Sequence, residues 1–100
     1  MLDTRKVTRE MLIEPIDIRS RAGELSFSAA KSLADAAARN KTPEPVLLAW
    51  FDEKAWKHSP AVVCGCGEKP SWVVYAQSRG GTISVYLNDG EYVFVYKEST

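Results

Sequence analysis

The most informative segment of the chain is TISVYLNDGEYVFVYK, which spans residues 82–97. Apolar and aromatic residues dominate it, and the Asp89-Gly90 dipeptide at its centre favours a two-residue hairpin turn. This turn predicts two antiparallel strands in a register that pairs Val85 with Phe94. The segment is therefore expected to form a β-hairpin.

A further strand is predicted just upstream, at SWVVYAQ, because this apolar run precedes Gly80-Gly81, a second hairpin dipeptide. The strands of the resulting three-stranded meander are Ser71–Gln77, Thr82–Asn88 and Glu91–Lys97. Because side chains alternate along a strand, the residues of each face can be assigned. One face is apolar and suited to covering by a helix, and it holds Trp72, Val74, Ala76, Ile83, Val85, Leu87, Tyr92, Phe94 and Tyr96.

The opposite face of the meander is also too apolar to remain in contact with water. A single helix covers one side of a sheet only, so something else is needed on this side. The candidates are residues 52–70, a second copy of the chain, or a ligand. A chain with 13 basic and 13 acidic residues has no net charge to oppose self-association. We therefore predict contact with a second copy, or with another protein, through Val73, Tyr75, Tyr86, Val93 and Val95.

A covering helix is predicted at residues 26–39, where Ser26 can accept a hydrogen bond as the N-cap residue. Its apolar residues recur every three or four positions, at Phe27, Ala30, Leu33, Ala34, Ala37 and Ala38. Strands are predicted on both sides of the helix, one beginning near Ile16 and an interior one at Val46–Phe51. The large core residues are expected to be Phe27, Leu33, Leu48, Val85 and Phe94.

The predicted fold class is α+β, with a single helix packed on a mostly antiparallel sheet that ends in the C-terminal three-stranded meander. The 100 residues are expected to form one domain, residues 1–100, with a loose tail at residues 1–10. Balanced charge gives no basic stripe for nucleic acid. No apolar run approaches the roughly 20 residues that span a bilayer, and no secretory leader is evident, so a cytoplasmic location without membrane contact is expected.

Soft, titratable groups are concentrated between residues 52 and 70. Cys64 and Cys66 are the only two cysteines, and His58 is the only histidine. Three interpretations of the cysteines are open: they bind zinc or copper, they cycle between dithiol and disulfide, or they are small buried hydrophobic residues at a bend. His58 could be a third ligand, a base that activates a thiol, or a solvated loop residue.

Other side chains carry weaker signals. Trp50, Trp56 and Trp72 could line an aromatic pocket, but core packing of Trp50 and Trp72 is the simpler interpretation. Asp52 and Glu53 could supply acid–base groups. Charged residues beside a strand usually form only its solvated end, so these two carry no catalytic assignment.

Several short motifs together resemble a family of small, uncharacterised prokaryotic domain proteins. The motifs are Trp50-Phe51-Asp52, Ser59-Pro60, Gly67-Glu68-Lys69-Pro70-Ser71-Trp72, Tyr75-Ala76, Arg79-Gly80-Gly81 and Asn88-Asp89-Gly90-Glu91-Tyr92-Val93-Phe94. The resemblance covers roughly residues 10–97 and implies a compact α+β domain. It implies no catalytic residue, because that family has no assigned activity.

Two classes of function remain open. The first, which we favour, is a non-enzymatic binding or self-assembling module, because the strand pattern demands an apolar contact face. The second is a thiol-redox or soft-metal-binding protein that uses Cys64, Cys66 and His58, with zinc or copper as the metal. The sequence does not establish an enzymatic activity.

Overall fold

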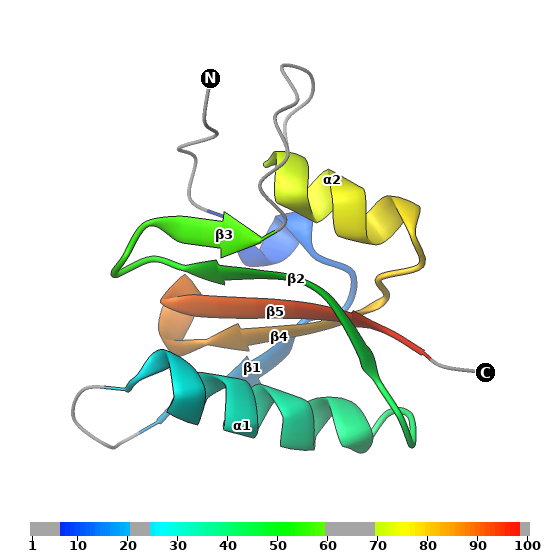
Figure 1. Cartoon of the computed structure of the whole chain (residues 1–100), viewed down its shortest axis with the longest axis horizontal. Helices are drawn as coiled ribbons and strands as arrows, with labels where there is room; N and C mark the ends of the chain where they lie inside the picture. The colour runs from blue at the N-terminus through cyan, green and yellow to red at the C-terminus, as the bar shows by residue number, and fades with distance from the viewer. Residues whose placement is uncertain (1–6, 21–24, 60–69, 99–100) are drawn as a thin grey trace.

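The computed structural model describes residues 7–20, 25–59 and 70–98 of the chain. Within these residues, one α-helix lies on each side of a five-stranded sheet (Figure 1). The elements are the 3-10 helix η1 (Arg9–Met11), β1 (Ile16–Ile18), α1 (Phe27–Arg39), β2 (Val46–Asp52), β3 (Lys57–Ser59), α2 (Ser71–Ser78), β4 (Ile83–Leu87), the 3-10 helix η2 (Asn88–Gly90) and β5 (Tyr92–Lys97). The predicted α+β class is confirmed.

The sheet has the strand order β1-β4-β5-β2-β3, so the C-terminal hairpin occupies its centre. The predicted register is confirmed, because Val85 pairs with Phe94 across β4 and β5. All neighbouring strands are antiparallel except β1, which runs parallel to β4. Since β5 is antiparallel to both β4 and β2, β1 and β2 point in the same direction. The intervening α1 therefore makes a crossover between two parallel strands.

α1 covers the sheet face that the strand pattern assigned to a helix. The side-chain oxygen of Ser26 accepts a hydrogen bond from the backbone nitrogen of Ala29 at 3.1 Å, as predicted for the N-cap. Ala30, Ala34 and Ala38 are buried, and their small side chains let the helix approach the sheet closely. The buried sheet residues beneath them are Ile83, Val85, Leu87, Tyr92, Phe94 and Tyr96.

The predicted core position of Leu33 is wrong, because its side chain is 38% exposed. Successive helix residues are rotated by about 100°. The buried line of α1 runs through Ala30, Ala34 and Ala38, so Leu33 lies a quarter turn or more away from the sheet. Among the other predicted core residues, Val85 and Phe94 are fully buried, whereas Phe27 and Leu48 are partly buried against the core.

The predicted first strand of the meander is also wrong, because residues 71–78 form α2. The buried residues Trp72, Val73 and Ala76 recur at the three-to-four spacing of a helix face. A short apolar run fits a strand and a buried helix equally well, and its β-branched and aromatic residues do not decide between them. The tertiary position of this segment, against the second sheet face, selects the helix.

The second hairpin dipeptide, Gly80-Gly81, ends this helix instead of turning a strand. Gly80 has a φ of +87°, which a residue with a side chain rarely adopts. The backbone nitrogen of Gly81 donates to the carbonyl of Ala76 at 2.9 Å, and that of Gly80 donates to Gln77 at 3.3 Å. This pair of hydrogen bonds is a Schellman motif, which uses glycine for the same positive φ that hairpin turns require.

α2 and the N-terminal segment cover the second face of the sheet (Figure 1). The amide nitrogen of Gln77 donates to the carbonyl of Met11 at 2.9 Å and joins the two covering segments. The cluster between them and the sheet contains Val7, Leu12, Ala49, Phe51, Trp72, Val73, Ala76, Tyr86, Val93 and Val95. The apolar second face predicted from the strand pattern therefore exists, but the chain covers it with its own residues.

The predicted self-association face is corrected accordingly. Tyr86, Val93 and Val95 are buried beneath α2, and Val73 lies within α2 itself. Tyr75, also on α2, is partly exposed and has the guanidinium of Arg79 3.8 Å from the centre of its ring. These residues do not form one exposed patch, so a second copy cannot dock on them without displacing α2.

Candidate functional site

Of the three residues proposed for thiol or metal chemistry, only His58 is described by the structure. Cys64 and Cys66 lie in residues 60–69, outside the described part of the chain. His58 is in β3, is half-buried, and its ring stacks against that of Trp72 with centroids 6.4 Å apart. Residues 7–20, 25–59 and 70–98 contain no group of three His, Cys, Asp or Glu side chains able to hold a metal ion.

His58 belongs to an aromatic cluster where β2 and β3 meet the start of α2. Phe51 and Trp72 stack in parallel, with ring centroids 5.7 Å apart and an interplanar angle of 8°. Trp56 contacts the same Phe51 ring edge-on at 5.3 Å. Trp72 is only 1% exposed, so its predicted core role is confirmed. Trp50 packs on the other side of the sheet, edge-on to Phe27 at 4.7 Å.

Trp56 is the exposed member of this aromatic cluster. Its side chain is 43% exposed, although tryptophan is usually largely buried. Its backbone is left-handed, with a φ of +52°. For a bulky residue this conformation costs roughly 1–2 kcal/mol. Strain of this kind persists where the surrounding structure imposes it, and such sites are often functional.

The loop between β2 and β3 holds Trp56 in this conformation. The backbone nitrogen of Trp56 donates to the carbonyl of Glu53 at 3.2 Å, and that of Ala55 donates to the carboxylate of Asp52 at 3.2 Å. Lys54 forms an ion pair with Glu91 at 2.9 Å, which ties the loop to the start of β5. The indole is thus presented by a fixed turn. Asp52 acts here as a turn residue, and no substrate-binding role is needed to explain it.

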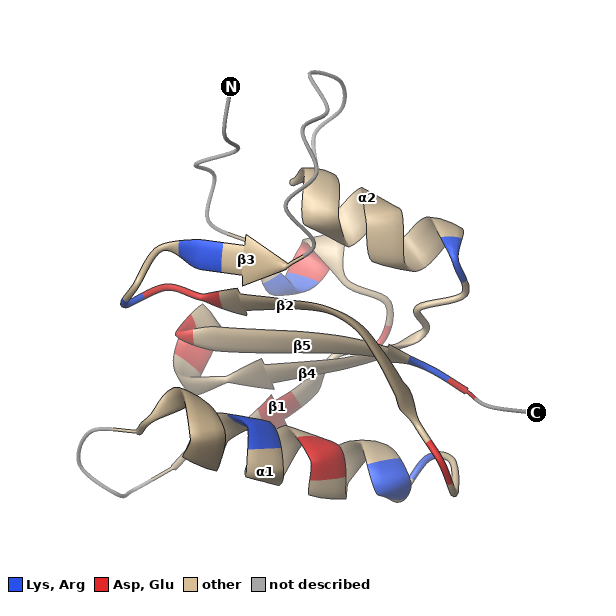
Figure 2. Ribbon diagram, viewed as in Figure 1, with Lys and Arg blue, Asp and Glu red and all other residues tan. Residues whose placement is uncertain are grey.

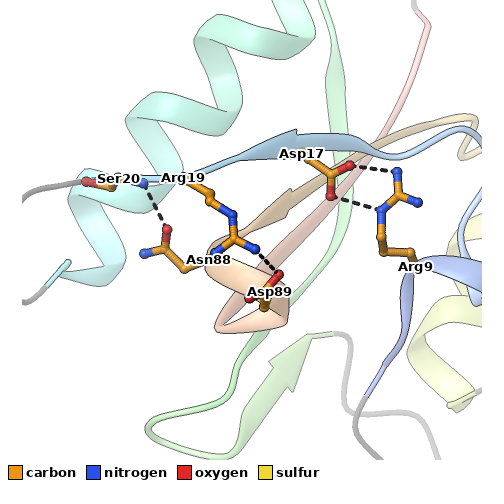
Figure 3. A network of polar contacts seen from close by, with 6 residues as sticks. All are labelled: Arg9, Asp17, Arg19, Ser20, Asn88 and Asp89. Atoms are coloured by element: carbon orange, nitrogen blue, oxygen red, sulfur yellow. Dashed lines mark hydrogen bonds and ion pairs between the residues drawn. The ribbon is translucent and has the colours of Figure 1, made fainter.

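A group of ion pairs and hydrogen bonds surrounds β1 (Figure 3). Arg9 donates to both carboxylate oxygens of Asp17, at 3.0 Å and 2.6 Å. Arg19 forms an ion pair with Asp89 at 2.6 Å, and the backbone nitrogen of Ser20 donates to the side chain of Asn88 at 2.9 Å. These contacts connect the short edge strand β1 to η1 on one side and to η2 on the other.

The pairs around β1 line a cavity of about 310 Å³ with Ile18 and Tyr86 at its base. The charges of Arg9, Asp17, Arg19 and Asp89 are already balanced in pairs. The four side chains are at least half exposed, and such exposed pairs typically contribute less than about 1 kcal/mol each. Their arrangement is explained by fastening β1 to the sheet. Both signs of charge are also interspersed over the rest of the described chain (Figure 2).

Another group of polar contacts joins α1 to β5. The hydroxyl of Tyr96 donates to Asp35 at 2.5 Å, and Lys31 forms an ion pair with the same carboxylate at 2.9 Å. Burial opposes ionisation of Asp35, but hydrogen bonds from Tyr96 and Lys31 outweigh it and lower the pKa of Asp35. Burial and the hydrogen bond to Asp35 raise the pKa of Tyr96 far above its ordinary value. Tyr96 therefore remains neutral and acts as a donor.

From the shifted pKa values of Asp35 and Tyr96 we predict that the fold loses stability at both low and high pH. The low pKa of Asp35 stabilises the fold above about pH 4, and this contribution is lost as the pH falls through that pKa. Above about pH 10 the tyrosine ionises in the unfolded chain but not in the folded protein. The free energy of unfolding therefore falls by about 1.4 kcal/mol per pH unit. Urea unfolding of wild type and Tyr96→Phe from neutral to alkaline pH checks this.

The variant is expected to be about 1–2 kcal/mol less stable at neutral pH and to show a shallower alkaline decline. The conservative change preserves the ring that packs beneath α1. An alkaline slope that is identical in both proteins would show that Tyr96 does not titrate as the buried donor described here.

A sheet flanked by α1 on one face and by α2 with η1 on the other defines a small α+β domain. The chain belongs to the family DUF5619, a domain of unknown function, whose match spans residues 13–96. This membership agrees with the resemblance to uncharacterised prokaryotic domains noted in the sequence. No described helix is long and apolar enough to cross a bilayer.

Both the sequence comparison and the structure comparison find similarity to a protein of Archaeoglobus fulgidus. An uncharacterised protein is 40% identical over 55 residues, and the aligned part spans 55% of this chain and 58% of that protein. The crystal structure of AF1514, described as a novel protein, has a TM-score of 0.73 and 28% sequence identity, over 89% of this chain and 98% of AF1514. The fold therefore occurs in a solved relative, and none of the three descriptions names an activity.

Sequence reasoning did not single out Trp56 as a surface residue. The sequence predicts strands at Val46–Phe51 and Ser71–Gln77 and leaves Trp56 in the connection between them, where an indole can pack in several ways. Its exposure follows from the short β2–β3 hairpin, which pairs Asp52 with Lys57 and leaves room for only four loop residues between them. No glycine or asparagine in that loop signals the positive φ, so the strain at Trp56 could be found only from the structure.

Proposed function

We propose that the protein is a non-enzymatic binding module that associates with a second copy of itself through the β2–β3 hairpin. The observation that supports this is Trp56, which is exposed and held in a strained left-handed conformation. Tryptophan is enriched among the residues that dominate binding energy at protein interfaces. An indole fixed by its turn also loses little conformational entropy when it binds.

The position of the hairpin in the sheet supports a symmetric contact. β3 is at one edge of the sheet formed by the described strands, and an edge strand offers one side of its backbone to a further strand. An antiparallel arrangement about a two-fold axis through His58 places Lys57 of each copy opposite Ser59 of the other. No like charges then face each other, and the zero net charge opposes association little.

Because β3 has only three residues, backbone pairing alone gives a weak contact. Most of the binding free energy must come from side chains, and Trp56 lies directly beside the strand on each copy. The aromatic cluster beneath it provides a rigid support, since Phe51 and Trp72 are nearly fully buried. The proposal therefore makes Trp56 the residue on which association depends.

Trp56→Ala is expected to weaken self-association by roughly 30-fold, which corresponds to about 2 kcal/mol at an interface hot spot. Sedimentation equilibrium of the full chain over a range of concentrations measures this. Val74→Ala is the matched control, because Val74 is 41% exposed on α2 and lies outside the proposed contact. The control should associate as the wild type does.

Two results would overturn this proposal. A wild-type protein that remains monomeric at the highest soluble concentration excludes self-association. Equal weakening by Trp56→Ala and Val74→Ala would show that association does not use the β2–β3 hairpin. Circular dichroism of each variant verifies that the fold is retained, as expected for exposed side chains.

The second candidate function is thiol-redox or soft-metal chemistry at Cys64 and Cys66 with His58. One observation favours it: the His58 ring stacks against that of Trp72, two residues before residues 60–69, which include both cysteines. A fixed imidazole is better suited to ligate zinc or copper, or to accept a thiol proton, than a freely rotating one.

Metal analysis and a free-thiol count on the protein purified without added metal separate the two candidates. Bound zinc or copper that is lost in a Cys64→Ser/Cys66→Ser variant supports the metal role. A disulfide that forms and is reduced reversibly supports the redox role. Unreactive thiols without bound metal would leave the binding module as the function.

A further inference from the structure

A cavity at the opposite side of the sheet from the β2–β3 hairpin has the character of a small-molecule site. It has a volume of about 310 Å³ and lies where β1 and β4 begin and β5 ends, beyond the last turn of α1. This size is at the lower limit of roughly 300–1,000 Å³ typical of ligand pockets. Its lining comes from four separate segments of the chain, Ile13, Glu14, Ile16, Lys41, Thr82, Ile83 and Glu98.

The apolar part of the cavity consists of three isoleucines. Ile83 is buried and Ile16 is half-buried, so they form a rigid base that belongs to the α1-side core. Ile13 is 41% exposed, which leaves a large aliphatic surface in contact with water. A ligand with a short aliphatic chain would cover this surface and gain about 25 cal/mol per Å² removed from water.

The charged part of the cavity has both signs. Glu14, Lys41 and Glu98 line it, and none of them forms an ion pair with another described residue. This distinguishes the cavity from the one beside β1, where Arg9 and Arg19 are already paired with aspartates. Two carboxylates and one ammonium without partners can receive a ligand that itself carries an ammonium and a carboxylate.

The backbone at Glu14 adds an independent observation. Its φ is +39°, and the next residue is Pro15, which normally restricts the preceding residue to extended conformations. The strained turn places Glu14 at the rim of the cavity. Strained non-glycine residues of this kind gather at ligand sites more often than elsewhere.

We propose that this cavity binds a free α-amino acid with an aliphatic side chain. The side chain lies on Ile13, Ile16 and Ile83, the ammonium group binds the carboxylates of Glu14 and Glu98, and the carboxylate binds Lys41. A purely apolar ligand would leave the three charged groups unused. A simple amine would leave Lys41 unpaired, and a simple carboxylic acid would face two carboxylates.

The test is a titration of the isotopically labelled full chain with L-leucine, followed by amide and side-chain NMR shifts. Saturable shifts are expected at residues that line the cavity, and not around Trp56. The same titration is repeated with 3-methylbutylamine, which lacks the carboxylate, and with 4-methylpentanoate, which lacks the ammonium group. Each is expected to bind at least roughly tenfold more weakly than leucine.

Matched variants assign the charged groups. Lys41→Met and Glu14→Gln are each expected to weaken leucine binding by roughly tenfold or more. Arg79→Met is the control, because Arg79 is an exposed cation directly after α2, outside both the cavity and the β2–β3 hairpin. NMR spectra of all variants report whether the fold is intact.

Three outcomes would overturn the proposal: no saturable shifts at millimolar leucine, equal binding of leucine and 3-methylbutylamine, or equal effects of Lys41→Met and Arg79→Met. The cavity is remote from the β2–β3 hairpin, so these results are independent of self-association.

Discussion

Replacing Trp72 with alanine is expected to lower the free energy of unfolding by about 3–5 kcal/mol. Trp72 is 1% exposed and stacks on Phe51, so its removal leaves a cavity between α2 and the sheet. For a domain whose total stability is about 5–15 kcal/mol, this is a large fraction. Urea unfolding monitored by circular dichroism measures the change.

Trp56→Ala is the matched control for this experiment, because it removes the same side chain from an exposed position of the same aromatic cluster. Its cost is expected to be about 1 kcal/mol. If Trp72→Ala cost no more than this control, α2 could not be packed on the second face as described.

Phe94→Ala is expected to cost a similar 3–5 kcal/mol on the opposite face of the sheet. Phe94 is fully buried in the central strand β5, and its ring is 5.5 Å from that of Phe27 on α1. The buried α1 residues of this cluster, Ala30, Ala34 and Ala38, carry only a methyl group and cannot extend into the space that is left. The same unfolding measurement applies.

Leu33→Ala provides the comparison on α1. Helical spacing predicts Leu33 as a core residue, just as strand alternation predicts Phe94, but Leu33 is 38% exposed. Its truncation should change stability by about 0.5 kcal/mol or less. A cost for Leu33→Ala comparable to that of Phe94→Ala would mean that α1 is rotated about its axis relative to the structure.

The sequence correctly predicts those local structures for which a motif has a single structural meaning. Asp89-Gly90 sets the register of the β4–β5 hairpin, and Ser26 begins α1 as its N-cap. Gly80-Gly81 was ambiguous, because a positive φ serves a hairpin turn and a Schellman cap equally well. Interpreted as a hairpin turn, the dipeptide wrongly predicts a strand at Ser71–Gln77 in place of α2. Without α2, the prediction has no helix on the second face of the sheet.

The candidate sites are harder to predict from the sequence than the secondary structure is, because they combine residues that only the folded chain brings together. Glu14, Lys41 and Glu98 are far apart in the sequence, and only the arrangement of strand ends around α1 places them on one cavity. The cysteine motif is visible in the sequence but lies outside the described residues. His58, its proposed partner, is placed by the structure against Trp72, a contact that no spacing rule predicts.

The strand order has a consequence for how the protein is made. β1 and β2 are synthesised first, yet between them in the sheet lie β4 and β5, which are synthesised last. The apolar strand β2 therefore leaves the ribosome with only the short β3 as a partner nearby in the sequence. The five-stranded sheet therefore cannot be completed until residues 83–97 have been synthesised, because β5 joins β2 to β4 and β4 joins β5 to β1.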